Sequence, residues 1–208
     1  MPTQDRQRKA GSPGLSRREL VITIPVSALA PRLAAAAAPE ALRSLSPKQM
    51  RIVEAMVARL IPSDENGPGA REAGVARYID RALAEARPTE RDDYTASLTA
   101  LDAYAQANHG AAFADLSPDR QDMVLTALEQ NRAPGLKPDS RTFFDMVRNQ
   151  TLEGMFGDPH YGGNANFIGW DLIGYPGLRP LASGEEQKLR VKVKPARQSA
   201  YGGGRGGH

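Results

Sequence analysis

The sequence contains no cysteine, and this absence excludes several kinds of chemistry at once. A chain without cysteine has no disulfides, no thiolate nucleophile, no iron–sulfur ligands and no covalent C-x-x-C-H haem attachment. Histidine is also scarce, with three in the chain: His109, His160 and the terminal His208. Zinc sites usually take three or four nitrogen or sulfur ligands. The sequence therefore predicts a chain with no metal and no cofactor of its own.

Aromatic residues are few, at 6% of the chain, and no apolar run approaches the roughly 20 residues that a membrane span needs. The 208 residues, 40% of them hydrophobic, are enough for one domain with a sizeable core. Alanine, leucine and arginine are abundant, which favours helix over sheet. We expect an all-α fold: a small domain of about five helices with a long irregular C-terminal segment rich in glycine and aromatic residues.

The net charge of +3 hides an uneven distribution. Residues 1–39 carry a net charge of +4, and residues 184–208 carry another +4, which leaves −5 for the body between them. Affinity for nucleic acid comes mostly from neutralising phosphates with basic side chains. A mildly acidic body is therefore a poor nucleic-acid binder, and we expect no nucleic-acid partner.

The N-terminal residues 1–38 have the layout of an export signal, with a basic start, an apolar run over 20–33 and an alanine run over 34–38. The run Ser16-Arg17-Arg18-Glu19-Leu20-Val21 is similar to the twin-arginine motif, in which Arg17 and Arg18 are the signature pair. The alternative is a basic tail with a chance arginine pair. Because twin-arginine export carries folded proteins, often with a partner attached, the signal predicts export of a complex to the periplasm.

Helix signals fill the region after the signal. Ser46-Pro47 and Ser117-Pro118 each combine a hydroxyl N-cap with proline at the first helical position. The apolar spacing predicts helices at about 47–61, 70–86 and 90–108, a fourth from 118 through 128, and a fifth from 139 or 140 through 152. We place the helical domain at 39–183. Residues 184–208 form a basic, glycine-rich tail, predicted to be an extended arm with a flexible end.

The stretch 153–180 reads EGMFGDPHYGGNANFIGWDLIGYPGLRP and holds the only tryptophan. Each glycine costs about 0.5–1 kcal/mol of extra chain entropy relative to alanine, so this density of glycine predicts a fixed, irregular loop whose shape matters. The residues that could act at its surface are Asp158, His160, Tyr161, Gly162, Gly163, Asn164, Phe167, Trp170 and Tyr175.

Three interpretations of this stretch stay open. Asp158 lies two residues from His160 and could orient it as a general base, although no serine or cysteine nucleophile lies beside them. Tyr161, Trp170 and Tyr175 could stack on a sugar or anchor a protein interface, because Trp and Tyr dominate interface hot spots. Phe167 and Trp170 could instead plug the helical core.

Several motifs in the chain resemble the gluconate 2-dehydrogenase subunit 3 family. The closing part carries Gly157-Asp158-Pro159-His160-Tyr161-Gly162-Gly163-Asn164, then Gly169-Trp170 and Ile173-Gly174-Tyr175-Pro176-Gly177. The first half carries Leu60-Ile61-Pro62, Gly74-Val75 and Tyr78-Ile79-Asp80. The resemblance covers about 45–180, and a twin-arginine signal is also typical of this family.

The resemblance implies a small, cofactor-free, non-catalytic subunit of a periplasmic FAD-dependent sugar or sugar-acid dehydrogenase. It implies a large flavoprotein partner of the glucose–methanol–choline type, a possible third subunit that is a multihaem cytochrome c, and export through the twin-arginine translocase with assistance in folding the large subunit. The family supplies no established catalytic residues in this subunit, and the nine loop residues are predicted to dock on the partner. The alternatives are a free-standing periplasmic carbohydrate-binding protein and an enzyme that uses Asp158 and His160.

Overall fold

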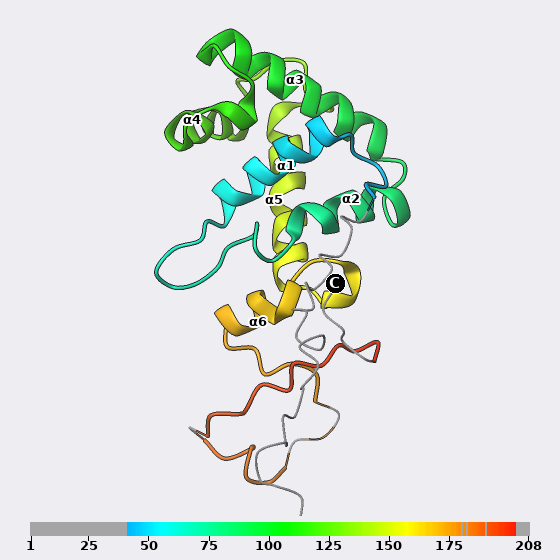
Figure 1. The fold of residues 1–208 in the computed structure, drawn as a ribbon, viewed down its shortest axis with the longest axis vertical. Coiled ribbons are helices and arrows are strands. Elements are labelled where there is room, and N and C mark those ends of the chain that lie inside the picture. Colours follow the sequence, from blue (N-terminus) through cyan, green and yellow to red (C-terminus); the bar gives the residue numbers. More distant parts are fainter. Residues whose placement is uncertain (1–40, 180, 182, 190, 203–208) are drawn as a thin grey trace, which may run out of the picture. The chain divides into compact units, whose positions relative to one another are not determined.

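The computed structural model describes residues 41–179, 181, 183–189 and 191–202. The predicted export segment 1–38, with Arg17 and Arg18, and the end of the tail at 203–208 lie outside these residues. Within the described part the fold is built from helices and short 3-10 turns, and no β-strand forms there (Figure 1). The predicted all-α fold is confirmed.

Helix α1 (Pro47–Leu60) begins where the sequence places it. The side chain of Ser46 accepts a hydrogen bond from the backbone N–H of Gln49, and the Gln49 side chain accepts one from the N–H of Ser46. This reciprocal capping box satisfies two N–H groups that the first turn would otherwise leave without partners. The helix ends just before Pro62, because proline disfavours helical backbone in the residue that precedes it.

Helix α2 (Val75–Glu85) is shorter than the predicted 70–86. Gly74 has a left-handed conformation at φ 72°, which a residue with a Cβ rarely adopts, and it forms the N-cap. Ala70 and Ala73 are buried but lie in turns. Gly74 therefore marks the start of the helix.

Helices α3 (Arg91–His109) and α4 (Pro118–Glu129) follow, with a 3-10 turn, η2 (Phe113–Asp115), between them in the chain. Gly110 ends α3, close to the predicted end at about 108. The buried carboxylate of Asp102 accepts a 2.9 Å hydrogen bond from the N–H of Phe113 and so fixes the connection between α3 and η2.

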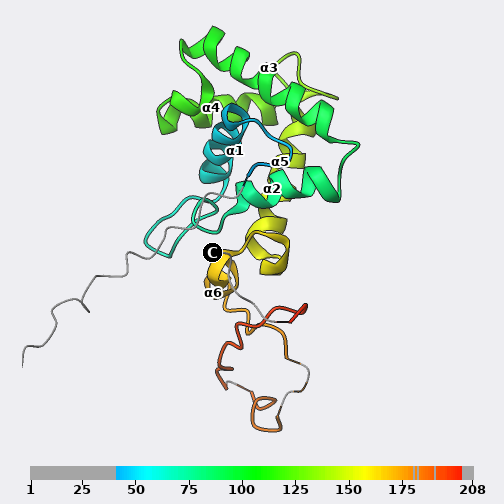
Figure 2. The same cartoon turned by 45° about the vertical axis from the view of Figure 1, so that its right-hand side comes forward.

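Helix α5 (Ser140–Phe156) runs through the middle of the described fold and contacts α1, α2, α3, α4 and α6 (Figures 1 and 2). Asp139 caps it by accepting a hydrogen bond from the N–H of Thr142 at 3.0 Å. Phe143 packs edge-on against Tyr94 of α3 with 5.2 Å between the ring centroids. The other helices thus bury their apolar faces against one central helix. It ends where residues 157–177, called the glycine–aromatic loop here, begin.

Two 3-10 turns, η3 (Pro159–Tyr161) and η4 (Ala165–Phe167), and a five-residue helix, α6 (Ile168–Leu172), follow α5. The described residues after α6 contain no further helix (Figure 1). Their last part, residues 191–202, is called the arm here, and it returns to the loop through contacts of Ala196, Arg197, Ala200 and Tyr201. No helix in the described residues is both long and apolar enough to cross a membrane.

Candidate functional site

The glycine–aromatic loop closes directly onto the last turns of α5. A Cβ on Gly163 would overlap the carbonyl oxygen of Gly154, and a Cβ on Gly169 would overlap that of Met155. Gly154 is itself a contact point, because a Cβ there would lie 2.8 Å from the Tyr78 ring. These glycines allow loop backbone to pack against helix backbone and α2 to pack against α5, at separations that no other residue permits.

Asn164 holds the two ends of this loop together. Its side-chain Nδ2 donates to the carbonyl oxygen of Gly157 at 2.8 Å, and its Oδ1 accepts from the N–H of Gly169 at 2.8 Å. The side chain is fully buried, so both of its polar groups need partners inside the protein. The next residue, Ala165, donates its N–H to the carbonyl of Ala73 at 3.0 Å and ties the loop to the turn before α2.

The only tryptophan of the chain is buried in this loop. Trp170 is 7% exposed, and its indole N–H donates to the carbonyl oxygen of Phe156 at 2.8 Å. Its ring packs against Phe167, with centroids 5.3 Å apart, and edge-on against Tyr175 at 4.9 Å. Phe167 is buried as well. Both residues are therefore buried, but inside the loop: neither belongs to the hydrophobic core that the helices share, so they do not plug the helical core itself.

In the polar turn over 158–163, the Asp158 carboxylate binds backbone N–H groups and does not orient the His160 ring as a catalytic pair would require. The Asp158 carboxylate accepts the backbone N–H of His160 at 2.9 Å, which makes it the N-cap of η3. Its other oxygen accepts the N–H of Ala200 at 2.8 Å. The carboxylate thus organises backbone rather than the imidazole, so the geometry gives no support to an acid–base role for His160.

The arm after α6 covers this turn. The ring of Tyr201 stacks on His160, with centroids 4.3 Å apart and planes 21° apart, and its hydroxyl is hydrogen-bonded to that of Tyr161. Four residues before Tyr201, Arg197 forms an ion pair with Asp171 at 2.6 Å. Tyr161 and His160 are exposed, yet each already has a ring partner from the chain's own C-terminal arm.

The titration behaviour of Asp158 follows from these contacts. Partial burial opposes its charge, but the N–H groups of His160 and Ala200 and the Ser199 hydroxyl together outweigh burial and hold the pKa of Asp158 below its ordinary 3.8. The hydrogen bond to Tyr201 raises the pKa of Tyr161 above its usual value. At neutral pH the turn therefore carries an ionised carboxylate and a neutral phenol.

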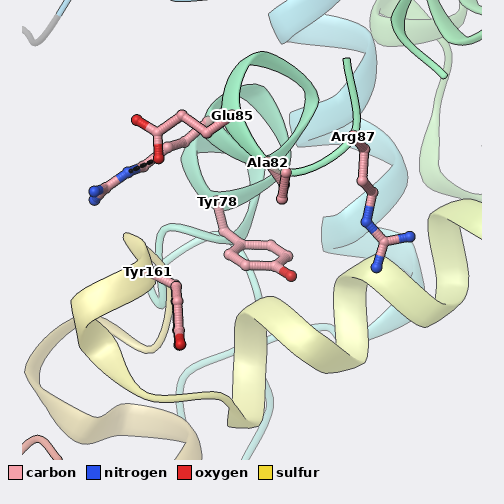
Figure 3. A pocket seen from close by; sticks show the side chains of 7 residues that line it. Tyr78, Ala82, Glu85, Arg87 and Tyr161 are labelled. Carbon is pink, nitrogen blue, oxygen red and sulfur yellow. Dashed lines mark hydrogen bonds and ion pairs between the residues drawn. The ribbon is translucent and has the colours of Figure 1, made fainter. Parts of the chain in front are cut away.

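A cavity of about 190 Å³ adjoins the turn, where α2 faces the end of α5. Tyr78 lies between Tyr161 and Arg87 in Figure 3, and the walls also include Arg81, Glu85 and two alanines. The charged groups of its walls are paired, as shown by two contacts from Arg87 to Glu153, at 3.0 and 2.9 Å, and one of 3.2 Å from Arg81 to Glu85.

Tyr78 contributes a polar group to the same cavity. Its hydroxyl donates to Glu153 at 2.8 Å. Burial, with the Glu153 hydrogen bond and charge, raises the pKa of Tyr78 to about 12. With its cations paired to carboxylates and its phenol neutral, the cavity offers mainly aromatic and aliphatic surface.

The nine predicted docking residues do not share one environment. Gly163, Asn164, Phe167 and Trp170 are buried and build the loop. His160, Tyr161 and Tyr175 are exposed, while Asp158 and Gly162 are intermediate. A stacking role for Trp170 on a sugar finds no support in this arrangement, because neighbouring aromatic rings and backbone already surround it.

Several contributors to the loop escaped the prediction. Tyr201 and Ala200 come from the arm, more than 35 residues away in the chain, and no sequence pattern connects them to the turn.

Asp80, outside the loop, was also not predicted as a structural acceptor. It is buried and accepts the N–H groups of residues 43–45. A carboxylate within the otherwise apolar face of α2 was a signal that could have indicated such a buried acceptor.

The fold and the loop together define a small all-α domain, closed by a glycine–aromatic loop that packs on the end of its central helix. The model of the family described as gluconate 2-dehydrogenase subunit 3 matches residues 47–177. The match spans α1 to the end of the loop, and the chain belongs to this family. Searches of curated proteins and of solved structures returned no match to this chain. The family name makes its members subunits of a dehydrogenase complex.

Proposed function

We propose that this protein is a non-catalytic accessory subunit of a periplasmic FAD-dependent sugar or sugar-acid dehydrogenase, and that it supports folding and twin-arginine export of the large flavoprotein subunit. The observation that carries the proposal is the family match over 47–177, which includes the whole glycine–aromatic loop. Oxidation of the sugar then takes place in the flavoprotein, with a multihaem cytochrome c as a possible third subunit.

The construction of the loop supports an accessory role. Its buried residues make the contacts that shape the loop itself: Asn164 bonds to Gly157 and Gly169, and Trp170 bonds to Phe156. Asp158, the carboxylate nearest the loop's histidine, is occupied by two backbone N–H groups. Such a loop presents a preformed shape, and rigid shape is what a docking surface needs in order to bind without a large ordering cost.

The export role is supported by the sequence before the domain. Arg17 and Arg18 lie in a motif similar to the twin-arginine signature, followed by an apolar run and an alanine run. Since that pathway carries folded proteins, one signal can export a bound partner that has none. The proposal therefore joins a signal to a docking domain in a single chain.

Export of the complex tests the proposal directly. The chain and the flavoprotein that co-purifies with it are produced together, and both are quantified in periplasmic and cytoplasmic fractions. Replacing the pair, Arg17→Lys with Arg18→Lys, should leave both proteins in the cytoplasm. The matched control is Arg6→Lys with Arg8→Lys, which changes two arginines outside the motif and should leave export intact.

Two further results bear on the accessory role. The chain produced alone should be colourless and inactive, and flavin colour with dehydrogenase activity should appear only in the presence of the large subunit. Export of the flavoprotein that is unaffected by the Arg17 and Arg18 changes would contradict the export role. Turnover by the isolated chain, abolished by His160→Ala, would contradict the non-catalytic role.

A further inference from the structure

A run of exposed apolar side chains follows the buried part of the loop. Leu172, Ile173, Tyr175 and Leu178 are between 39% and 58% exposed, although the chain's own arm is in place beside them. Large apolar patches on the surface of a soluble protein commonly mark an interaction site. The four residues fall within seven positions, at the end of α6 and just after it.

The run is held in a defined position. Leu172 ends α6, and the backbone N–H of Tyr175 donates to the carbonyl of Trp170 at 2.8 Å, which anchors the run to the buried core of the loop. On its other side, Ala196 of the arm donates to the carbonyl of Pro176, also at 2.8 Å. The backbone in the middle of the run is thus held by two hydrogen bonds, which lowers the ordering cost of binding.

Basic side chains border the run. The Arg179 side chain donates to the carbonyl of Lys194, so the arm and its lysines lie next to the end of the run. Lys192 and Lys194 are exposed, and neither forms an ion pair with the described residues. By contrast, Arg197 in the same arm is paired with Asp171. An apolar centre with unpaired cations at its edge is complementary to an apolar patch edged by carboxylates.

We propose that residues 172–178, with Lys192 and Lys194 at their border, form the surface that docks on the large dehydrogenase subunit, against an apolar patch with an acidic rim. This inference rests on the proposed function and locates its interface. We place the surface at 172–178 rather than at the His160–Tyr161 turn, because the Tyr201 ring already stacks on His160 and lies edge-on to Tyr161. Phe167 and Trp170 support the surface from beneath rather than contact the partner.

Site-specific cross-linking tests the location. A photo-crosslinking phenylalanine analogue replaces Ile173 in one protein and Met123 in another. Met123 is a matched control, since it is 61% exposed and apolar but lies on α4. In the exported complex, position 173 should cross-link to the flavin-bearing subunit, identified by its mass and bound flavin, and position 123 should not.

Substitutions test the chemistry of the surface. Ile173→Ser with Leu178→Ser should lower the yield of co-purified flavoprotein about tenfold, because buried apolar anchors dominate interface energies. Met123→Ser should not lower it. Lys192→Glu with Lys194→Glu should weaken association most at low salt, whereas Arg120→Glu with Arg132→Glu, on and just after α4, should have no such effect. The charge-reversal pair keeps the test valid even where the serine pair fails to fold.

The remaining outcomes overturn the inference in distinguishable ways. A flavoprotein that co-purifies but cross-links only from other positions, with unchanged yields in both variant pairs, refutes the surface and leaves the proposed function standing. Absence of any flavoprotein with the unmodified chain refutes both. Cross-links from position 173 to a second copy of this chain refute the proposed partner. Binding to anionic phospholipid vesicles that the serine pair abolishes, while the flavoprotein complex persists, assigns the surface to a membrane instead.

Discussion

The indole N–H of Trp170 donates a 2.8 Å hydrogen bond to the carbonyl oxygen of Phe156, the last residue of α5. The carbonyls at the end of a helix have no partner within the helix. Trp170 supplies one of these partners and brings a large buried ring with it. The contact therefore couples the end of the central helix to the loop that the family match includes.

Removing this bond should destabilise the domain. Trp170→Phe keeps a six-membered aromatic ring but removes the indole N–H, so the Phe156 carbonyl loses its partner. We expect the free energy of unfolding to fall by about 1–3 kcal/mol. Trp170→Ala also opens a cavity and should cost about 3–5 kcal/mol. Denaturant unfolding followed by circular dichroism measures both. Leu189→Ala, at a side chain that is 95% exposed, serves as the control and should change stability by less than about 0.5 kcal/mol.

Backbone packing against α5 gives a second prediction. Gly163→Ala places a methyl group against the carbonyl of Gly154, so the loop must shift away from the helix, at a cost of about 1–3 kcal/mol. Because Trp170 is the only tryptophan, its fluorescence reports the loop specifically. The emission should shift to longer wavelength as water reaches the ring. Gly184→Ala, where a Cβ meets nothing within 4 Å, should leave both the emission and the stability unchanged.

The helices were predictable because their signals are local. The capping box of Ser46 with Gln49, the proline after Ser117 and the cap at Asp139 each act within a few residues. Helix α6 was not predicted, since its five residues include a glycine and are too few to show a helical period. Its position depends on contacts with α5 that lie outside any local window.

The interior of the loop was predictable only in part. Its composition indicated a fixed shape, and the aromatic residues allowed either a buried plug or an exposed surface. Two contacts that fix the shape of the loop were not predictable: Asn164 bridges Gly157 and Gly169, and the N–H of the arm residue Ala200 donates to Asp158. Both depend on which segments meet in three dimensions, and the second joins residues 42 positions apart. Neither leaves a spacing pattern in the sequence.

The attachment of the arm should depend on pH. The pKa of Asp158 is held below its ordinary 3.8, since hydrogen bonds from His160 and Ala200 outweigh its partial burial. A carboxylate with a lowered pKa in the folded state stabilises that state at pH values above 3.8, and this stabilisation is lost as the pH falls through the lowered pKa. The arm should therefore bind the turn more weakly in acid than at neutral pH.

NMR titration measures this coupling. The amide resonances of His160 and Ala200 should shift together with one apparent pKa below 3.8, and Asp158→Asn should abolish both shifts. Asp119→Asn, which changes a carboxylate at the start of α4, should leave them unaltered. An Ala200 amide that does not follow the His160 amide would show that the other contacts of the arm, and not Asp158, hold it on the turn.

The last prediction concerns the start of the domain. The buried carboxylate of Asp80 accepts the backbone N–H groups of Arg43, Ser44 and Leu45 at 2.8, 2.9 and 2.7 Å. Asp80→Asn keeps the shape but replaces one acceptor oxygen by a donor, so at least one of these N–H groups loses its partner. We expect a loss of about 1–3 kcal/mol, because hydrogen bonds to a charged acceptor are among the stronger ones.

Hydrogen exchange at residues 43–45 distinguishes this effect from a general loss of stability. In Asp80→Asn the amides of these three residues should exchange much faster, while those of Val147 and Leu98, buried in α5 and α3, change only by the small global shift. Glu54→Gln, at an exposed carboxylate on α1, should leave all of them protected. Because this anchor fixes the chain just after the predicted export segment, unchanged protection in Asp80→Asn would mean that Leu45 packing alone sets where the folded domain begins.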